Sequence, residues 1–169
     1  MVKHSQLFID SLIHPKKLAA YRLLTIGKTI QYVFLLIALV TIYSFVQFLT
    51  GVSEITYNIQ GLTEYVDDIQ WLLYPFAFLL LTLTSTILLF IRISIYAFVG
   101  FCLLKLMHRR GEYRHMWRTA ALAITWSTLL TVLFSILKSS NIISTLIGIV
   151  ITIVILILAA QKYPKIPRK

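Results

Sequence analysis

The chain has 169 residues, of which 59% are hydrophobic and only 13% are charged. A water-soluble domain of this length cannot enclose so much apolar surface in one core, which excludes a soluble globular protein. Sixteen Lys and Arg against six Asp and Glu give a net charge of +10. Because these cations flank hydrophobic stretches, they indicate anionic membrane lipids rather than nucleic acid as the nearest partner.

The segment 1–28 mixes basic and apolar residues and predicts two short amphipathic helices on the inner leaflet. Pro15 fits the first turn of the second helix, where its missing N–H costs nothing. We expect Leu18, Tyr21 and Leu23 to enter the lipid interface. The basic side chains would extend toward the head groups: Lys16, Lys17 and Arg22.

Four hydrophobic stretches follow, each long enough to cross a hydrocarbon core of about 30 Å as a helix. They are residues 29–50, 71–107, 119–137 and 142–160. In lipid a single segment must satisfy its own backbone, so a helix is predicted even for the Ile-rich and Val-rich last stretch. The sequence therefore predicts an all-α integral membrane protein, with a four-helix transmembrane bundle over 29–160 and a basic cytoplasmic tail, 161–169.

The charges between the stretches predict the topology. The segments 1–28, 105–118 and 161–169 are rich in Lys and Arg, whereas the loop 51–70 has four carboxylates and no Lys or Arg. By the positive-inside rule, both termini and 105–118 face the cytoplasm and the loop 51–70 faces outward. The long stretch 71–107 then crosses the membrane once.

Two stretches resemble a family of bacterial membrane proteins known as domain of unknown function 1189. Phe8 to Leu36 reads FIDSLIHPKKLAAYRLLTIGKTIQYVFLL, and Glu112 to Ile136 reads EYRHMWRTAALAITWSTLLTVLFSI. The tail QKYPKIPRK is similar to the short Lys-Pro-Lys ending of that family. Its best-known relatives are called maltodextrin utilization proteins. The resemblance therefore implies a multispan plasma-membrane protein of a Gram-positive bacterium, distantly akin to Yip-type proteins and linked to sugar uptake. It implies no catalytic residues, and the large outer domain of such relatives is reduced here to the loop 51–70.

The sequence contains no HExxH, GxSxG, Walker-type or CxxC motif. The single cysteine, Cys102, excludes an internal disulfide. His108 and His115 are too few for a metal site, and Gly111 between them is expected to interrupt a helix. We therefore predict a protein that is not an enzyme and has no cofactor or metal. An acidic cluster in the outer loop is interpreted as a topology feature rather than a cation site: Glu64, Asp67 and Asp68.

Five arginines are the candidate contacts for lipids or a partner protein: Arg92, Arg109, Arg110, Arg114 and Arg118. The last four follow the second hydrophobic stretch, and each is expected to gain about 1 kcal/mol near an anionic leaflet. Arg92 stands alone in the run LFIRISIYAF, thirteen residues or about 20 Å before Lys105. Two placements remain open. In the first, which we favour, Arg92 lies at the inner interface and residues 93–107 run along the leaflet. In the second, Arg92 lies inside the hydrocarbon, where its charge costs several kcal/mol unless a partner compensates it.

A stripe of hydroxyl side chains follows the third stretch at helical spacing: Thr125, Thr128, Thr131 and Ser135. In lipid such a stripe normally faces another helix, where each hydroxyl bond contributes about 0.6 kcal/mol. The alternative is a substrate path. None of the four stretches contains Asp or Glu, which argues against proton-coupled transport by this chain.

From these features we predict an accessory, scaffold or regulatory subunit that engages anionic inner-leaflet lipids, another membrane protein or a second copy of itself. The alternative is a small oligomeric transporter or channel lined by the hydroxyl stripe.

Overall fold

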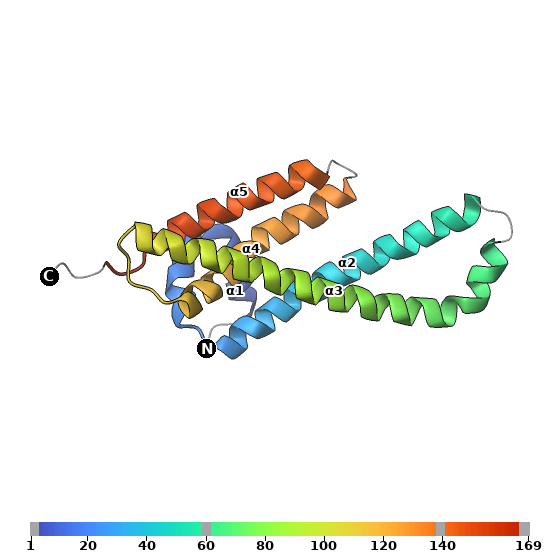
Figure 1. Ribbon diagram of the computed structural model, residues 1–169, viewed down its shortest axis with the longest axis horizontal. Coiled ribbons are helices and arrows are strands. Elements are labelled where there is room, and N and C mark those ends of the chain that lie inside the picture. The colour runs from blue at the N-terminus through green and yellow to red at the C-terminus, as the bar shows by residue number, and fades with distance from the viewer. Residues whose placement is uncertain (1–3, 59–61, 138–140, 166–169) are drawn as a thin grey trace. The chain divides into compact units, whose positions relative to one another are not determined.

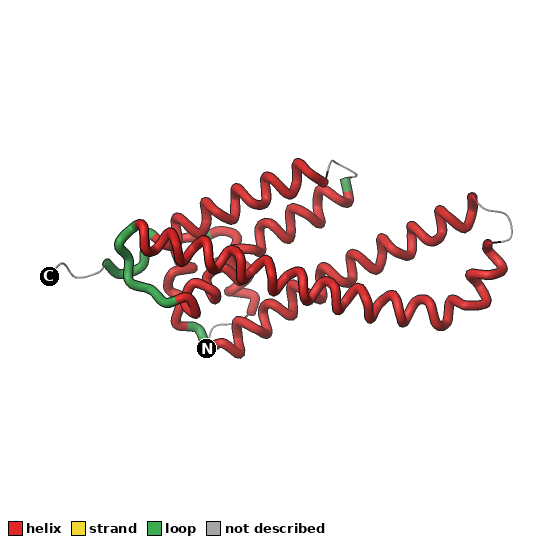
Figure 2. Tube along the Cα trace, viewed as in Figure 1, coloured by secondary structure: helices red, strands yellow, loops and turns green. Residues whose placement is uncertain are grey.

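The structure is a computed structural model that describes residues 4–58, 62–137 and 141–165. Within these ranges every regular element is a helix, as Figure 2 shows, so the predicted all-α fold class is confirmed. The elements in chain order are α1 (His4–Ile13), the 3-10 helix η1 (Pro15–Leu23), α2 (Ile26–Asn58), α3 (Leu62–Leu106), α4 (Tyr113–Ile136) and α5 (Asn141–Ala160) (Figure 1).

Four of these helices are long and apolar enough to cross a membrane, in agreement with the predicted number. Their apolar spans are Ile26–Thr56, Val66–Leu106, Tyr113–Ile136 and Ile142–Ala160. The chain is therefore a membrane protein. Its last two helices have lengths close to one bilayer crossing.

The helices α2 and α3 are longer than the stretches 29–50 and 71–107. With 45 residues, α3 extends about 68 Å at 1.5 Å per residue, more than twice the hydrocarbon thickness. The helix α2 continues past Thr50, where hydroxyl groups donate to backbone carbonyls of the same helix. The Ser53 hydroxyl donates to the Thr50 carbonyl, and the Thr56 hydroxyl donates to the Val52 carbonyl. Most of the predicted outer loop is thus helical.

The chain divides into two compact units, one of residues 1–34 with 90–169 and one of residues 35–89. In the second unit, α2 and α3 form an antiparallel helical hairpin (Figure 1). Phe45 of α2 meets Phe78 of α3 edge to face, with ring centroids 5.4 Å apart. Many large apolar side chains of this hairpin are exposed, including Trp71 and Leu79, as expected where lipid is the solvent.

The core of the first unit surrounds α4, in which residues 120–124 are fully buried. Small residues allow neighbouring helices to approach closely there. A Cβ atom at Gly148 of α5 would lie 3.0 Å from Ser127 Oγ of α4, and one at Gly100 of α3 would clash with Met116 of α4. Close approach at small residues is how membrane helices gain packing contacts.

The N-terminal segment packs on this core: α1 contacts α4, and η1 contacts both α4 and α5. Leu7, Ser11 and Leu18 are fully buried, whereas Leu23 is 73% exposed. The indole Nε1 of Trp126 in α4 donates to the Leu12 carbonyl at 3.0 Å. Leu18 is thus covered by protein, although the sequence placed it in the lipid interface.

The second N-terminal helix also differs from the expected amphipathic α-helix, because η1 has 3-10 geometry over nine residues. In a 3-10 helix side chains three residues apart lie on one face. Leu18 and Tyr21 therefore share the inner face, and both take part in contacts within the protein. Pro15 lies in the first turn, as predicted.

The end of α3 is fixed by local hydrogen bonds. His108 adopts a left-handed backbone, with φ of 50°. The N–H of Arg109 donates to the Leu104 carbonyl at 2.9 Å, and that of His108 to the Lys105 carbonyl at 3.2 Å. This pair of bonds is a Schellman motif, which usually has glycine at the left-handed position. The helix thus ends before Gly111.

Candidate functional site

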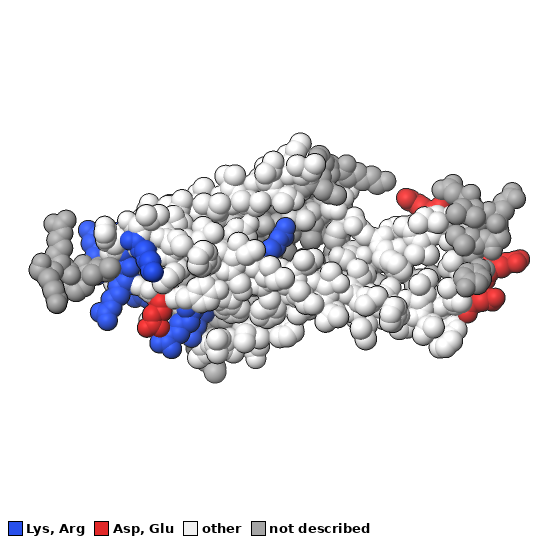
Figure 3. Space-filling view, viewed as in Figure 1, with Lys and Arg blue, Asp and Glu red and all other residues white. Residues whose placement is uncertain are grey.

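We use the term basic end for the cations around the end of α3, the start of α4 and η1: Arg22, Lys105, Arg109, Arg110, Arg114 and Arg118. All sixteen Lys and Arg of the chain belong to the first unit, which has only two carboxylates, Asp10 and Glu112. On the face drawn in Figure 3, most basic side chains lie close together and one stands apart on uncharged surface. Carboxylates therefore neutralise little of this positive charge.

Tyr163, which follows α5, organises the basic end. Its side chain is 1% exposed, and its phenol oxygen lies 2.7 Å from Thr119 Oγ1 and 3.3 Å from the His115 carbonyl oxygen of α4. Burial raises the pKa of this phenol above its ordinary value, partly offset by the Thr119 hydrogen bond. The ring also contacts Gly111, where an added Cβ would lie 3.0 Å from it. Tyr163 thus ties the tail to α4 and to the connection between α3 and α4.

Three arginines of the basic end are held by neutral groups. The guanidinium of Arg109 donates to the Tyr163 carbonyl at 2.8 Å, and that of Arg118 donates to the Arg22 carbonyl at 2.9 Å. Arg22 lies over the Tyr163 ring, 5.2 Å from its centroid, in a cation–π contact. The Nε of Arg118 is buried without a hydrogen-bond partner among the described residues. These contacts position the charges without cancelling them.

The remaining cations of the basic end are exposed. Lys105 lies 4.8 Å from the centroid of the Phe101 ring. The backbone N–H of Arg110 donates to the Pro164 carbonyl at 2.8 Å, and its side chain is exposed. Arg114 pairs with Glu112 at 2.5 Å, but both side chains are more than 60% exposed, so water screens this ion pair.

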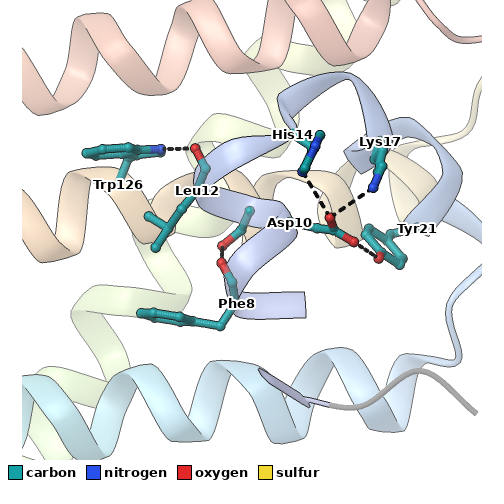
Figure 4. A network of polar contacts seen from close by, with 8 residues as sticks. Phe8, Asp10, Leu12, His14, Lys17, Tyr21 and Trp126 are labelled. Carbon is teal, nitrogen blue, oxygen red and sulfur yellow. Dashed lines mark hydrogen bonds and ion pairs between the residues drawn. The ribbon is translucent and has the colours of Figure 1, made fainter. Parts of the chain in front are cut away.

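Asp10 of α1 is the acceptor of a separate polar network that joins α1 to η1 (Figure 4). Its carboxylate accepts a 2.5 Å hydrogen bond from the Tyr21 hydroxyl and lies 3.3 Å from Lys17 Nζ and 3.2 Å from His14 Nδ1. The hydrogen bond from Tyr21 and the charge of Lys17 lower the pKa of Asp10, against a smaller opposing effect of burial. Burial and the Asp10 carboxylate together raise the pKa of Tyr21 to about 12.

A buried chain of hydroxyl groups joins three helices. The Tyr32 hydroxyl of α2 lies 2.7 Å from Thr125 Oγ1 of α4 and 3.3 Å from Ser11 Oγ of α1. Tyr32, Thr125 and Ser11 are all fully buried. Because each hydroxyl has a partner, this network satisfies polar groups inside the first unit and leaves no donor directed toward a ligand.

The predicted hydroxyl stripe of α4 is largely engaged within the protein. Thr125 and Thr128 are buried, and Thr128 and Thr131 bond to the carbonyls four residues earlier, Ile124 and Ser127. Ser135 is half-buried. These side chains therefore face neighbouring parts of the first unit or their own helix.

Arg92 differs from the other four predicted arginine contacts, because it is not part of the basic end. It lies on α3, half-buried, and lines a groove of about 300 Å³ between α3 and α5. The helix α3 passes through Arg92 without interruption.

No group of three or more potential metal ligands occurs among the described residues. His108 is exposed beyond the end of α3 and His115 lies in the first turn of α4. Glu64, Asp67 and Asp68 are exposed on α3.

Three residues that organise the first unit were not singled out from the sequence: Asp10, Tyr32 and Tyr163. The sequence did contain a signal for Asp10, which is the only carboxylate before residue 54. Tyr163 is likewise the only aromatic residue of the tail. Tyr32 had no such signal, since its partners lie 21 and 93 residues away.

Neither the curated proteins nor the solved structures contain a match to this chain. A family described as "Protein of unknown function (DUF1189)" matches residues 52–160, which is more than half of the chain. This region includes the resembling stretch from Glu112 to Ile136, whereas Phe8 to Leu36 and the tail lie outside it. The chain belongs to the DUF1189 family, whose function is unknown.

Proposed function

We propose that this protein is a non-enzymatic, multi-pass accessory or regulatory subunit of a larger membrane assembly. In this proposal the basic end lies against anionic lipid head groups of the inner leaflet, with both termini in the cytoplasm and residues 51–70 outside. The N-terminal segment lies at the same interface, with its exposed apolar residues, such as Ile13 and Leu23, in contact with lipid.

One observation carries the proposal, namely the way in which the arginines of the basic end are held. Arg22, Arg109 and Arg118 contact carbonyl groups or an aromatic ring, so their positions are fixed while their charge remains available. Fixed cations at the end of apolar helices suit phosphate head groups, which are acceptors for guanidinium hydrogen bonds. A catalytic site would instead need a nucleophile or an acid–base pair in a pocket.

The lipid part of the proposal can be tested with purified protein in neutral detergent. We expect phosphatidylglycerol to raise the melting temperature more than phosphatidylcholine does, and we expect salt to reduce the difference. Arg110→Gln combined with Lys105→Gln should weaken the response, because both side chains are exposed at the basic end. Gln70→Ala, which removes an exposed and uncharged side chain of α3, is the control. Equal responses to both lipids would contradict the lipid-binding role.

The subunit part can be tested by affinity purification from native membranes. Enrichment of a defined membrane protein in stoichiometric amount would support it, and recovery of the chain alone would oppose it. The resemblance to maltodextrin utilization proteins makes a sugar-uptake system of a Gram-positive plasma membrane the first assembly to examine, and the distant Yip-type likeness remains part of this proposal.

The transporter or channel alternative finds no support in the hydroxyl stripe. Thr125 bonds to Tyr32 and to the Leu122 carbonyl, and Thr128 bonds to the Ile124 carbonyl. Buried hydroxyls with partners inside the protein do not line an aqueous path. Solute flux in reconstituted vesicles that Thr128→Val and Thr131→Val abolished would reverse this preference.

A further inference from the structure

Arg92 is a cation in an apolar groove. The groove is lined by Arg92, Ile95, Tyr96 and Val99 of α3 and by Ile149 and Ile153 of α5. Among the residues that the structure describes, no hydrogen bond or ion pair engages the Arg92 guanidinium. An arginine among isoleucine and valine side chains is costly in lipid unless an anion accompanies it.

The groove lies near the middle of the membrane-spanning part of α5. Ile149 is seven residues after Ile142, where the apolar span begins, and Ile153 is seven residues before Ala160, where it ends. Each end is therefore about 10 Å away along the helix axis. Long basic side chains reach the interface when they lie close to a helix end, and Arg92 does not. This position favours the buried placement of Arg92 over the interfacial one.

The spacing of the lining residues suits a helix as the occupant. Arg92, Ile95, Tyr96 and Val99 follow i, i+3, i+4 and i+7 spacing, so they form one continuous face of α3. Ile149 and Ile153 have i, i+4 spacing on α5 and form the opposite wall. Two such walls accept the side chains of a third helix packed between them.

The chemistry of the groove restricts which helix can bind. A second copy of this chain has no Asp or Glu within the four hydrophobic stretches, so at this depth it would bring another arginine instead of an anion. Lipid phosphates lie at the interface, away from the centre of the span. A carboxylate on a transmembrane helix of a different protein meets both requirements, because intramembrane ionisable residues normally pair with one another.

We propose that this groove binds a transmembrane helix of a different membrane protein and that Arg92 pairs with an Asp or Glu carboxylate of that helix. The inference rests on the proposed function as an accessory subunit and specifies the partner by its intramembrane acid.

The first experiment compares tagged full-length variants purified from native membranes in mild detergent. Arg92→Gln should reduce recovery of the partner by at least about tenfold, as expected for loss of one member of a buried ion pair. Arg92→Lys should retain most of it, since the charge is kept. Lys162→Gln, which removes an exposed cation that is not one of the six residues of the basic end, is the matched control and should leave recovery unchanged.

The second experiment locates the contact and identifies its chemistry. A photo-cross-linking amino acid at Ile149, inside the groove, should label the partner, whereas the same residue at Ile147, exposed on a different face of α5, should not. The labelled partner helix should contain an Asp or Glu. Exchange of the charges, with Arg92→Glu in this chain and Arg in place of the partner acid, should restore recovery.

The outcomes separate this inference from the function on which it rests. A partner recovered equally with Arg92→Gln, or one whose labelled helix has no carboxylate, overturns the inference and leaves the accessory role standing. Labelling of a second copy of this chain at Ile149, or of lipid only, also overturns it. Recovery of the wild-type chain without any partner overturns both.

Discussion

The phenol oxygen of Tyr163 lies 2.7 Å from Oγ1 of Thr119, which joins the tail after α5 to the beginning of α4. Both residues are buried at this contact. We expect Tyr163→Phe to lower the free energy of unfolding by about 1 kcal/mol, because it removes the hydroxyl that bonds to Thr119 and leaves Thr119 with its bond to the His115 carbonyl. Tyr163→Ala should cost about 3–5 kcal/mol, since it also empties a buried ring site. Unfolding in mixed detergent micelles measures both. Equal losses for the two variants would show that the ring contributes nothing.

His108 provides a prediction of increased stability. It occupies the left-handed position of the motif that ends α3, with φ of 50°. Glycine adopts this conformation without the steric cost of a Cβ atom, which is about 1–2 kcal/mol. His108→Gly should therefore raise the melting temperature, and His108→Val should lower it. The same substitution at His115, which lies in helix α4, is the control, and His115→Gly should destabilise.

The network around Asp10 predicts a dependence of stability on pH. The folded-state pKa of Asp10 lies below its ordinary value of 3.8, so the ionised form is favoured by folding. The contribution of Asp10 is present above that ordinary value and is lost as the pH falls through the lower folded pKa. The difference in melting temperature between wild type and Asp10→Asn should therefore be positive at pH 7 and shrink below about pH 4. Glu112→Gln, at an exposed ion pair, should show little difference at either pH. A difference that stays constant down to pH 2 would contradict the assignment.

Gly148 tests the close approach of α4 and α5. A Cβ at this position would lie 3.0 Å from Ser127 Oγ and 3.4 Å from Ser127 Cα. Gly148→Leu should therefore push the helices apart and cost about 1–3 kcal/mol of unfolding free energy. Gly51→Leu is the matched control, because no other atom lies within 4 Å of a Cβ there. A similar loss at both positions would mean that the effect does not arise from contact with Ser127.

The helical elements were predictable because lipid leaves an isolated apolar segment few alternatives to a helix. The number of membrane-length helices followed from this rule. The ends of α2 and α3 did not follow from it. The extension of α2 past Thr50 includes local bonds from hydroxyl groups to backbone carbonyls, which carry no hydrophobic signal. The composition of a polar connection alone does not reveal such bonds.

The arrangement of the candidate site was only partly predictable. The arginines of residues 109–118 could be identified as a group from charge density alone. Their division into exposed side chains, such as Arg110, and positioned ones, such as Arg109, depends on the Tyr163 carbonyl, 54 residues away from Arg109. The docking of η1 on α4 and α5 is equally non-local. Patterns within one segment contain no information about such pairings.

The hydrogen bond from the Trp126 indole to the Leu12 carbonyl gives the first unit an intrinsic optical reporter. With Trp71 and Trp117 replaced by Phe, all tryptophan fluorescence would come from the indole that donates to the Leu12 carbonyl of α1. Release of the N-terminal segment by lipid, salt or a partner would then appear as a change in emission wavelength and quenching, without any attached dye. Tryptophan fluorescence can thus report whether the N-terminal segment stays docked on α4 while the protein functions.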